Sequence, residues 1–148
     1  MENYTERYFE EIAEDESATI EGMRTVTEAD VVNFAGVSGD FSPLHMSKEY
    51  ARNSAYSRRV PHGNLIFAIT EGIAVEPNRK AIASYGHDNL RYVNSAAIGD
   101  TLTVQRDVIG KEDYSDDAGK ITYKYETLNQ DGKTLLVDHH DLLVEKEP

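Results

Sequence analysis

PHGNLIFAITEGIAVEP, residues 61–77, is the most apolar stretch of this chain and decides its fold. Apolar side chains recur at positions i, i+1, i+4 and i+8, which is helical spacing: Leu65, Ile66, Ile69 and Ile73. The pattern predicts one α-helix that is buried on most of its sides. Such a helix needs a layer to pack against, and the rest of the chain supplies that layer as strands.

Five other segments read as β-strands: residues 18–26, 83–93, 101–110, 120–128 and 134–146. In 101–110 and 120–128 the apolar side chains fall on alternate positions, as they do in a strand with one buried face. Asp131-Gly132 is a strong hairpin signal between the last two segments. These elements predict an α+β domain in which an antiparallel sheet of about five strands packs one face on the helix. The other face must be solvated or covered by a second copy of the chain.

Two shorter helices are predicted before the apolar one. Thr27 is a candidate N-cap with Asp30 three residues on, and the helix it opens ends at Gly36 or Gly39. A second helix opens at Ser47. The stretch between them, GDFSPLH (39–45), is predicted to be a loop.

Composition limits the class of protein. A chain of 148 residues favours one domain, residues 1–148. It has no cysteine, which fits a reducing cytoplasm and excludes thiolate metal sites. The polar N-terminus does not read as a signal peptide, and no apolar run reaches the ~20 residues that span a bilayer. The net charge of −12 argues against nucleic acid as a partner.

A basic island interrupts the acidic sequence between residues 46 and 64. This segment contains one acidic residue, Glu49, and four basic residues: Lys48, Arg52, Arg58 and Arg59. Such an island either attracts an anionic ligand into an otherwise repulsive field or is an ordinary solvated helix face.

Asp40 and His45 are the candidate acid–base pair. General acid–base catalysis needs two titratable groups within reach of one reacting atom or water. Gly39 permits a tight entry to the segment, and Pro43 stiffens it. Gly63 opens the apolar helix, where unpaired amides and the positive end of the helix dipole suit an oxyanion. The structural alternatives are a helix-capping turn for Asp40 and His45, and helix–strand packing for Gly63.

Three blocks of sequence together resemble one known family, the MaoC-like (R)-specific enoyl-CoA hydratases of the hot-dog fold. They are SGDFSPLHMSKEYA, VPHGNLIFAI and RYVNSAAIGDTL, and the resemblance covers about residues 7–145. The family motif runs roughly Gly-Asp-x-Asn-Pro-x-His, followed by a His-Gly pair and a later Gly-Asp turn. The resemblance implies a curled sheet around a central helix, a homodimer or higher homo-oligomer, and acyl-CoA tunnels near the subunit interface.

The resemblance also implies the reaction, a carbon–oxygen lyase step of fatty-acid metabolism. The enzyme would interconvert trans-2-enoyl-CoA and (R)-3-hydroxyacyl-CoA without metal or redox cofactor. Asp40 and His45 match the pair that activates water, and Gly63 matches the backbone donor to the thioester oxygen. Lys48, Arg58 and Arg59 are candidate contacts for the CoA phosphates.

Two residues depart from the family pattern. Ser42 stands where Asn is usual, and its short hydroxyl is expected to bond to the turn backbone. Asn64 follows the His-Gly pair where an apolar residue is usual, which puts the polarity of the acyl pocket in question.

The other polar residues are read as structural. His62 is interpreted as a core histidine that orders the loop, and His87 as a surface residue. His139 and His140 adjoin in a strand and therefore point to opposite faces. For Thr70 and Glu71 on the apolar helix two alternatives stay open: each either lines the pocket or faces outward.

Two other functions remain open on the sequence. One is an acyl-CoA thioesterase of the same fold, although such enzymes typically carry their carboxylate on the central helix. The other is a non-catalytic acyl-binding protein or heteromer subunit, which would usually lack the Asp40–His45 pair. The net charge of −12 should repel an acidic acyl carrier protein and therefore favours CoA as the carrier. Chain length and pathway are not encoded in these motifs.

Overall fold

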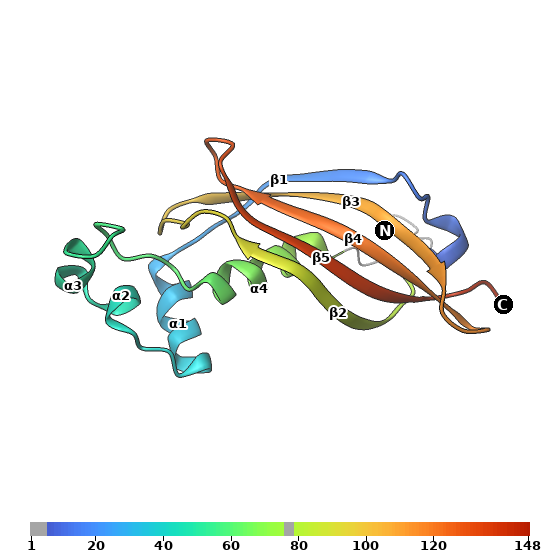
Figure 1. The fold of residues 1–148 in the computed structure, drawn as a ribbon, viewed down its shortest axis with the longest axis horizontal. Helices are drawn as coiled ribbons and strands as arrows, with labels where there is room; N and C mark the ends of the chain where they lie inside the picture. Colours follow the sequence, from blue (N-terminus) through green and yellow to red (C-terminus); the bar gives the residue numbers. More distant parts are fainter. Residues whose placement is uncertain (1–5, 76–78) are drawn as a thin grey trace, which may run out of the picture.

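One curled antiparallel sheet wraps around a central helix in the computed structural model, which describes residues 6–75 and 79–148 (Figure 1). The five strands are arranged in the order β1-β3-β4-β5-β2. Their bounds are β1 Ser17–Thr25, β2 Ala81–Tyr92, β3 Thr101–Asp113, β4 Ala118–Leu128 and β5 Thr134–Glu145. The predicted α+β class and the antiparallel pairing of the strands are confirmed.

The central helix is α4, Gly63–Ala74, and the sheet curls over it (Figure 1). Its buried side chains face the sheet: Leu65, Ile66, Ile69, Thr70 and Ala74. One stripe at helical spacing, Asn64, Ala68 and Gly72, stays exposed. The expected burial on most sides is therefore confirmed, with this stripe as the exception. The helix begins two residues later than the quoted segment, and Pro77 lies outside the described residues.

Polar contacts tie α4 to the sheet at two levels. The buried hydroxyl of Thr70 donates to the Ile66 carbonyl at 2.9 Å and lies 2.7 Å from the Thr127 hydroxyl of β4. Arg106 of β3 donates to the Ala74 carbonyl at 3.0 Å, at the C-terminal end of the helix. A guanidinium there satisfies an unpaired carbonyl and complements the negative end of the helix dipole.

The first residues close the far end of the sheet. A short 3-10 helix, η1 Phe9–Glu11, buries Phe9 against β4. A Cβ atom at Gly119 would lie 2.2 Å from the Phe9 ring, so only glycine permits this approach. Phe9 thereby joins the core cluster that contains Ile121, Tyr123 and Tyr125.

Three helices gather at the other end of the molecule, beside the start of α4 (Figure 1). They are α1 Glu28–Ser38, α2 Pro43–Met46 and α3 Lys48–Arg52. The predicted capping box of Thr27 and Asp30 is confirmed, as are the end of α1 at Gly39 and the cap of α3 by Ser47. The expectation of a loop at 39–45 is wrong in part, because Pro43 opens the one-turn helix α2. A proline is favoured at the first position of a helix, where its fixed φ is already helical.

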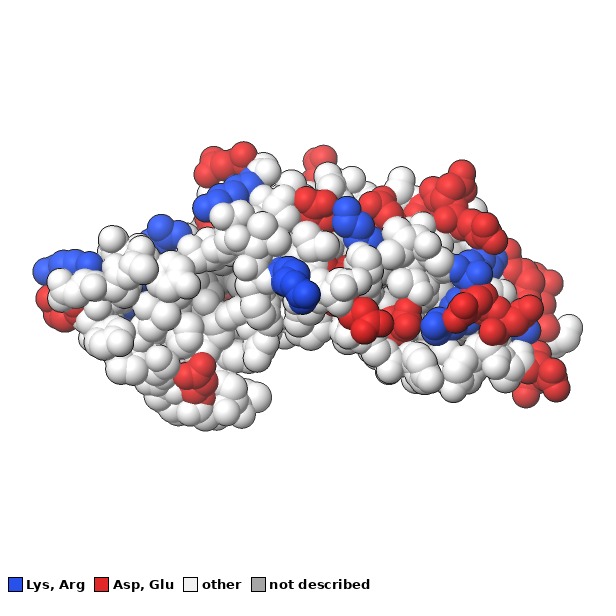
Figure 2. Space-filling model, viewed as in Figure 1, with Lys and Arg blue, Asp and Glu red and all other residues white. Residues whose placement is uncertain are grey.

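Charge is unevenly distributed over the surface. Figure 2 shows acidic side chains crowded over the end of the sheet that carries the C-terminus, with fewer over the three helices. Among the described residues, no helix has both the length and the apolar character needed to cross a membrane.

Candidate active site

Asp40 is placed by the end of α1. Gly39 adopts a left-handed conformation, φ 78°, and its amide donates to the Ala35 carbonyl at 2.8 Å. That conformation suits glycine and turns the chain sharply after the helix. Asp40 therefore emerges directly from the turn, and half of its side chain remains exposed (51%).

Asp40 also holds the turn that leads to His45. Its Oδ1 accepts a 3.0 Å hydrogen bond from the Ser42 amide, just before α2 begins at Pro43. The Ser42 hydroxyl was expected to bond to the turn backbone, but it makes no capping hydrogen bond to α2, and the Asp40 carboxylate holds the turn instead. The family position occupied by Ser42 therefore contributes its backbone here rather than its side chain.

His45 lies at the end of this one-turn helix with its ring fixed. Its Nδ1 is 2.7 Å from the Val60 carbonyl, which can only accept, so Nδ1 carries the proton and donates. The remaining ring nitrogen, Nε2, then has a free lone pair and lies 3.7 Å from Asp40 Oδ2. A neutral imidazole in this tautomer can accept a proton at Nε2.

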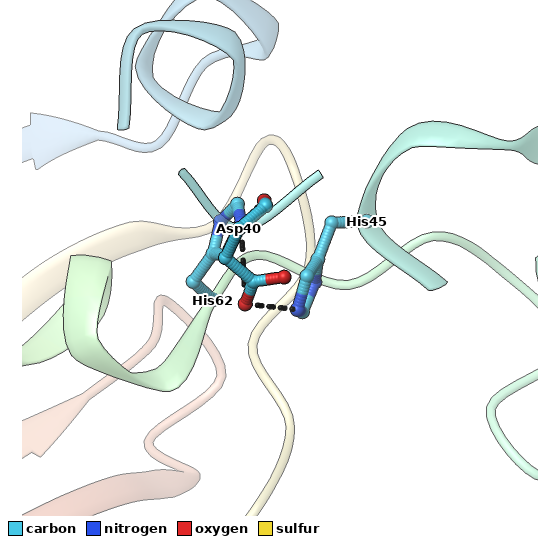
Figure 3. Close-up of side chains that lie close together, drawn as sticks. All are labelled: Asp40, His45 and His62. Atoms are coloured by element: carbon cyan, nitrogen blue, oxygen red, sulfur yellow. Dashed lines mark hydrogen bonds and ion pairs between the residues drawn. The ribbon is translucent and has the colours of Figure 1, made fainter. Parts of the chain in front are cut away.

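The carboxylate and the imidazole converge on one point (Figure 3). Their 3.7 Å separation is too long for a direct hydrogen bond but allows one water to contact both groups. The side chain of His45 is only 13% exposed, whereas Asp40 reaches solvent. This arrangement can hold a water and remove its proton.

His62 backs the pair from the residue before α4. Its Nε2 donates to the Asp40 carbonyl at 2.8 Å, and its ring packs on His45 with centroids 3.8 Å apart. The interpretation that His62 orders the loop agrees with these contacts. Its Nε2 also lies 3.9 Å from the Asp40 carboxylate, so the residue belongs to the same cluster.

Asp40, His45 and His62 bring potential ligand atoms within 4.8 Å of one another. His62 Nε2, the ring nitrogen nearest the Asp40 carboxylate, carries a proton, because it donates to the Asp40 carbonyl. A protonated ring nitrogen has no lone pair to give to a metal, so His62 does not complete a ligand set in this arrangement. The geometry suits a bound water better than a metal.

Gly63 presents its amide at the start of α4, next to the pair. Within the described part of the chain this amide makes no hydrogen bond, as expected for the first residue of a helix. A Cβ atom at Gly63 would lie 3.1 Å from the ring of Tyr92, which closes over this position from the end of β2. The Tyr92 hydroxyl donates to the Asn64 side chain. Asn64 thus has a local polar partner.

Two cavities meet at these residues. One has a volume of about 490 Å³ and the other about 420 Å³. His45, Gly63 and Tyr92 line both, while Asp40 and His62 line only the smaller one. The larger cavity extends past Ile66, Val93 and Lys133. The sequence indicated Asp40, His45 and Gly63 but not Tyr92, because nothing in the pattern of a strand says which neighbour its last residue covers.

The basic island lines a third cavity of about 370 Å³. Arg59 makes two 2.6 Å hydrogen bonds with the Glu28 carboxylate, and Arg52 pairs with Glu49 at 3.0 Å. For Lys48 and Arg58 no carboxylate partner occurs among residues 6–75 and 79–148. Of the three candidate phosphate contacts, Arg59 is therefore paired with a carboxylate, whereas Lys48 and Arg58 make no close ion pair among these residues. Glu28 also lines this cavity, and the pKa of its carboxyl is lowered by the hydrogen bonds from Arg59 and, to a smaller extent, by the charge of Lys48.

A second polar cluster lies farther along α4, and it corrects one expectation. His87 is not a surface residue: its ring stacks on buried His140 with centroids 4.3 Å apart. Its Nδ1 bonds at 2.7 Å to Asp138, whose side chain is fully buried. Glu71 lies 3.4 Å from His140. As predicted, adjacent His139 points to the other face, where it contacts Asn89.

Comparisons with known proteins identify the family. Residues 11–130 match the model of the MaoC like domain. The chain is 42% identical over 100 residues to Protein MaoC of Klebsiella aerogenes, a match that covers 67% of this chain and only 30% of that protein. It is 32% identical over 103 residues to an (R)-specific enoyl-CoA hydratase of Rhodospirillum rubrum, covering 70% of each.

Solved structures share the fold over nearly the whole chain. The X-ray structure of a monoamine oxidase regulatory protein from Archaeoglobus superposes with a TM-score of 0.90 at 32% identity, covering 97% of both chains. A Mycobacterium tuberculosis protein described as a double hotdog fold gives a TM-score of 0.83 at 15% identity, covering 97% of this chain and 45% of that one. The expected hot-dog fold is thus confirmed.

Proposed function

The chain belongs to the MaoC-like domain family, and on that premise we propose that it is a hydratase that interconverts trans-2-enoyl-CoA and (R)-3-hydroxyacyl-CoA. One observation carries the proposal: Asp40 Oδ2 and His45 Nε2 lie 3.7 Å apart on a cavity that also contains the Gly63 amide. Hydration of a conjugated thioester needs an activated water and an oxyanion donor close together.

In the proposed reaction Asp40 and His45 hold one water between them. One of the two removes its proton as the oxygen adds to Cβ of the enoyl thioester. Negative charge then develops on the thioester oxygen, where the Gly63 amide at the positive end of α4 stabilises it. A proton delivered to Cα completes the 3-hydroxyacyl product, and the reverse sequence eliminates water.

The larger cavity supports a substrate with an acyl chain. Its walls combine apolar side chains with His45 and the Gly63 position. The cavity of Lys48 and Arg58 is the proposed site for the CoA phosphates, since among the described residues its four basic side chains outnumber its one carboxylate, Glu28, and so favour an anion there. Residues 1–148 would act as one domain, and a cytoplasmic location fits the cysteine-free composition.

A homodimer is part of the proposal. Among the described residues β2 pairs only with β5, so its other edge is open over 12 residues. Large apolar side chains on and beside this strand are exposed: Ile82, Tyr85, Tyr92 and Val93. An open, apolar edge favours pairing with another strand. Tyr92 and Val93 also line the large cavity, so a second copy at this edge would help to enclose the substrate.

Crotonyl-CoA tests the proposal. Purified protein should remove the enoyl-thioester absorbance without releasing free thiol, and Asp40→Asn should lose about 10²- to 10⁴-fold in rate while it stays folded. Asp116→Asn, in an exposed turn, is the matched control and should match the unsubstituted protein.

Release of thiol would instead establish the thioesterase alternative. Tight binding of acyl-CoA without turnover would establish the non-catalytic one. A normal rate in Asp40→Asn would remove the assigned role of this carboxylate.

A further inference from the structure

The second cluster contains a serine, a histidine and a carboxylate, and the histidine contacts the other two through its two ring nitrogens. Ser84 Oγ on β2 lies 2.8 Å from His140 Nε2, and the other nitrogen of that ring, Nδ1, lies 3.4 Å from Glu71 Oε2. Each of the three comes from a different element: Glu71 from α4, Ser84 from β2 and His140 from β5. This is the order of contacts by which a histidine activates a serine and a carboxylate orients the histidine.

We propose that Ser84, His140 and Glu71 form a second catalytic site, which hydrolyses esters of short acyl groups with Ser84 as the nucleophile. The site is separate from the Asp40–His45 pair and does not depend on the proposed hydratase function.

Burial prepares the histidine for this role. His140 is 5% exposed, and burial, with His87 and Arg79 nearby, lowers its pKa to about 4. The ring is therefore neutral above that pH and able to accept a proton. A weakly basic histidine also predicts slow turnover.

Glu71 selects which ring nitrogen carries the proton. The Tyr125 hydroxyl, 3.2 Å from His140 Nδ1, can donate to that nitrogen or accept from it. An ionised Glu71 can only accept, so it draws the proton to Nδ1 and leaves Nε2 to accept from Ser84. Glu71 Oε1 is buried and has no hydrogen-bond partner among the described residues, so the carboxylate is not held elsewhere.

The surroundings of Glu71 set the pH at which its carboxyl ionises and can orient His140. Burial raises its pKa to about 7, and Asp138 acts in the same direction, while His87 and Arg79 act in the opposite one. The hydrolytic rate should consequently increase as the pH rises through about 7, when Glu71 becomes a carboxylate. Glu71 is thus a positioning residue, whereas Ser84 and His140 touch the substrate or its proton.

The adjoining cavity limits the acyl group. It holds about 100 Å³, roughly three times the volume of a water in the liquid. Tyr125, His140 and Leu142 form part of its wall, whereas Ser84 does not. An acyl group on Ser84 therefore reaches this cavity only past His140, and only an acetyl-sized group fits inside it. Arg79 also lines it, and its positive charge favours a negatively charged group in this cavity.

Access and backbone geometry agree with a reactive serine. Ser84 is exposed on the edge strand, and the register of β2 against β5 shifts between Ser84 and Gly86. Bulges of this kind often redirect a side chain beside an active site. Pairing of β2 edges in a homodimer would use backbone groups, whereas side chains stand roughly perpendicular to the sheet.

The reaction balances without any further reagent. Ser84 Oγ attacks the ester carbonyl as its proton moves to His140 Nε2, and a new Oγ–C bond forms. The ester C–O bond then breaks, and the leaving alcohol takes the proton from His140. A water, deprotonated by His140, attacks the acyl-serine, releases the carboxylic acid, and Ser84 regains its proton.

Hydrolysis of p-nitrophenyl acetate tests the proposal. Ser84→Ala should lose at least about tenfold of the rate. Ser115→Ala, an exposed serine between β3 and β4, is the matched control and should lose none. A fluorophosphonate probe should label the protein once, and peptide mass spectrometry should place the label on Ser84. Glu71→Gln should abolish the increase in rate through pH 7, and p-nitrophenyl octanoate should react far more slowly than the acetate.

Hydration of crotonyl-CoA by Ser84→Ala separates this proposal from the previous one, because Ser84 takes no part in that reaction. An unchanged acetate rate in Ser84→Ala, or a label on any other residue, overturns the second site. Ester hydrolysis that survives in Ser84→Ala and disappears in Asp40→Asn overturns it as well.

Discussion

The two ends of α4 carry two histidine–carboxylate clusters that are built in opposite ways. At the N-terminal end Asp40 is half exposed and lies five residues from His45 in the sequence. Near the C-terminal end Glu71 and His140 lie 69 residues apart, and the side chain of His140 is only 6% exposed. A pair that handles water needs access to solvent, and Asp40 provides it. The buried cluster instead has its protonation set by the fold.

The largest difference between the two clusters is expected when His45 is replaced. His45→Gln keeps the size and polarity of the side chain but removes its proton chemistry, so crotonyl-CoA hydration should fall by about 10²- to 10⁴-fold. Thermal unfolding should change little, since the Gln amide can still donate to the Val60 carbonyl. His139→Gln, a half-buried histidine outside both clusters, is the control and should keep the full rate. Equal losses in both variants would show that the substitution damages the fold and not the reaction.

The buried cluster should reveal itself in the pH dependence of stability. The pKa of Glu71 rises from 4.5 to about 7 on folding, so the folded protein holds this proton more tightly than the unfolded chain does. Stability from this group is therefore present below pH 4.5 and is lost as the pH rises towards 7. Glu71→Gln should remove that loss, and its stability relative to the unsubstituted protein should increase by about 1–2 kcal/mol between pH 4.5 and 7.

Urea unfolding at several pH values measures this difference. His140 acts in the opposite direction, because its lowered pKa makes stability rise between pH 4 and 6.5. Glu49→Gln, which removes one negative charge from an exposed side chain, is the control for the loss of a charge alone. A constant offset in Glu71→Gln at every pH would contradict the raised pKa.

The smallest effect on hydration is expected from substitutions in the basic island, where the charges face solvent. Lys48→Ala with Arg58→Ala should raise KM for crotonyl-CoA by about two- to fivefold at low salt, with kcat unchanged and the effect fading as salt increases. Arg59→Ala should leave KM unchanged, since its charge is neutralised by Glu28. A KM that rises equally in both proteins would assign the phosphate contact to Arg59 as well.

Local patterns carried the fold and the first cluster. The spacing of Leu65, Ile66 and Ile69 predicts α4, and the capping box at Thr27 predicts α1. Asp40, His45 and Gly63 were found in the same way, because a turn and a helix start bring together residues that are near in sequence. The helix α2 was missed, since a four-residue element opened by Pro43 looks like a turn in the sequence.

The sequence by itself thus determined the helix α4, the strands, and a candidate pair whose two members lie five residues apart. Each of these depends on backbone periodicity or on a short turn. Tertiary structure alone decided that the Val60 carbonyl fixes the His45 tautomer and that Tyr92 closes over Gly63. It also decided that Ser84, His140 and Glu71 meet. Contacts of that kind depend on strand register and on the rotation of α4 against the sheet, which are set by packing of the whole core.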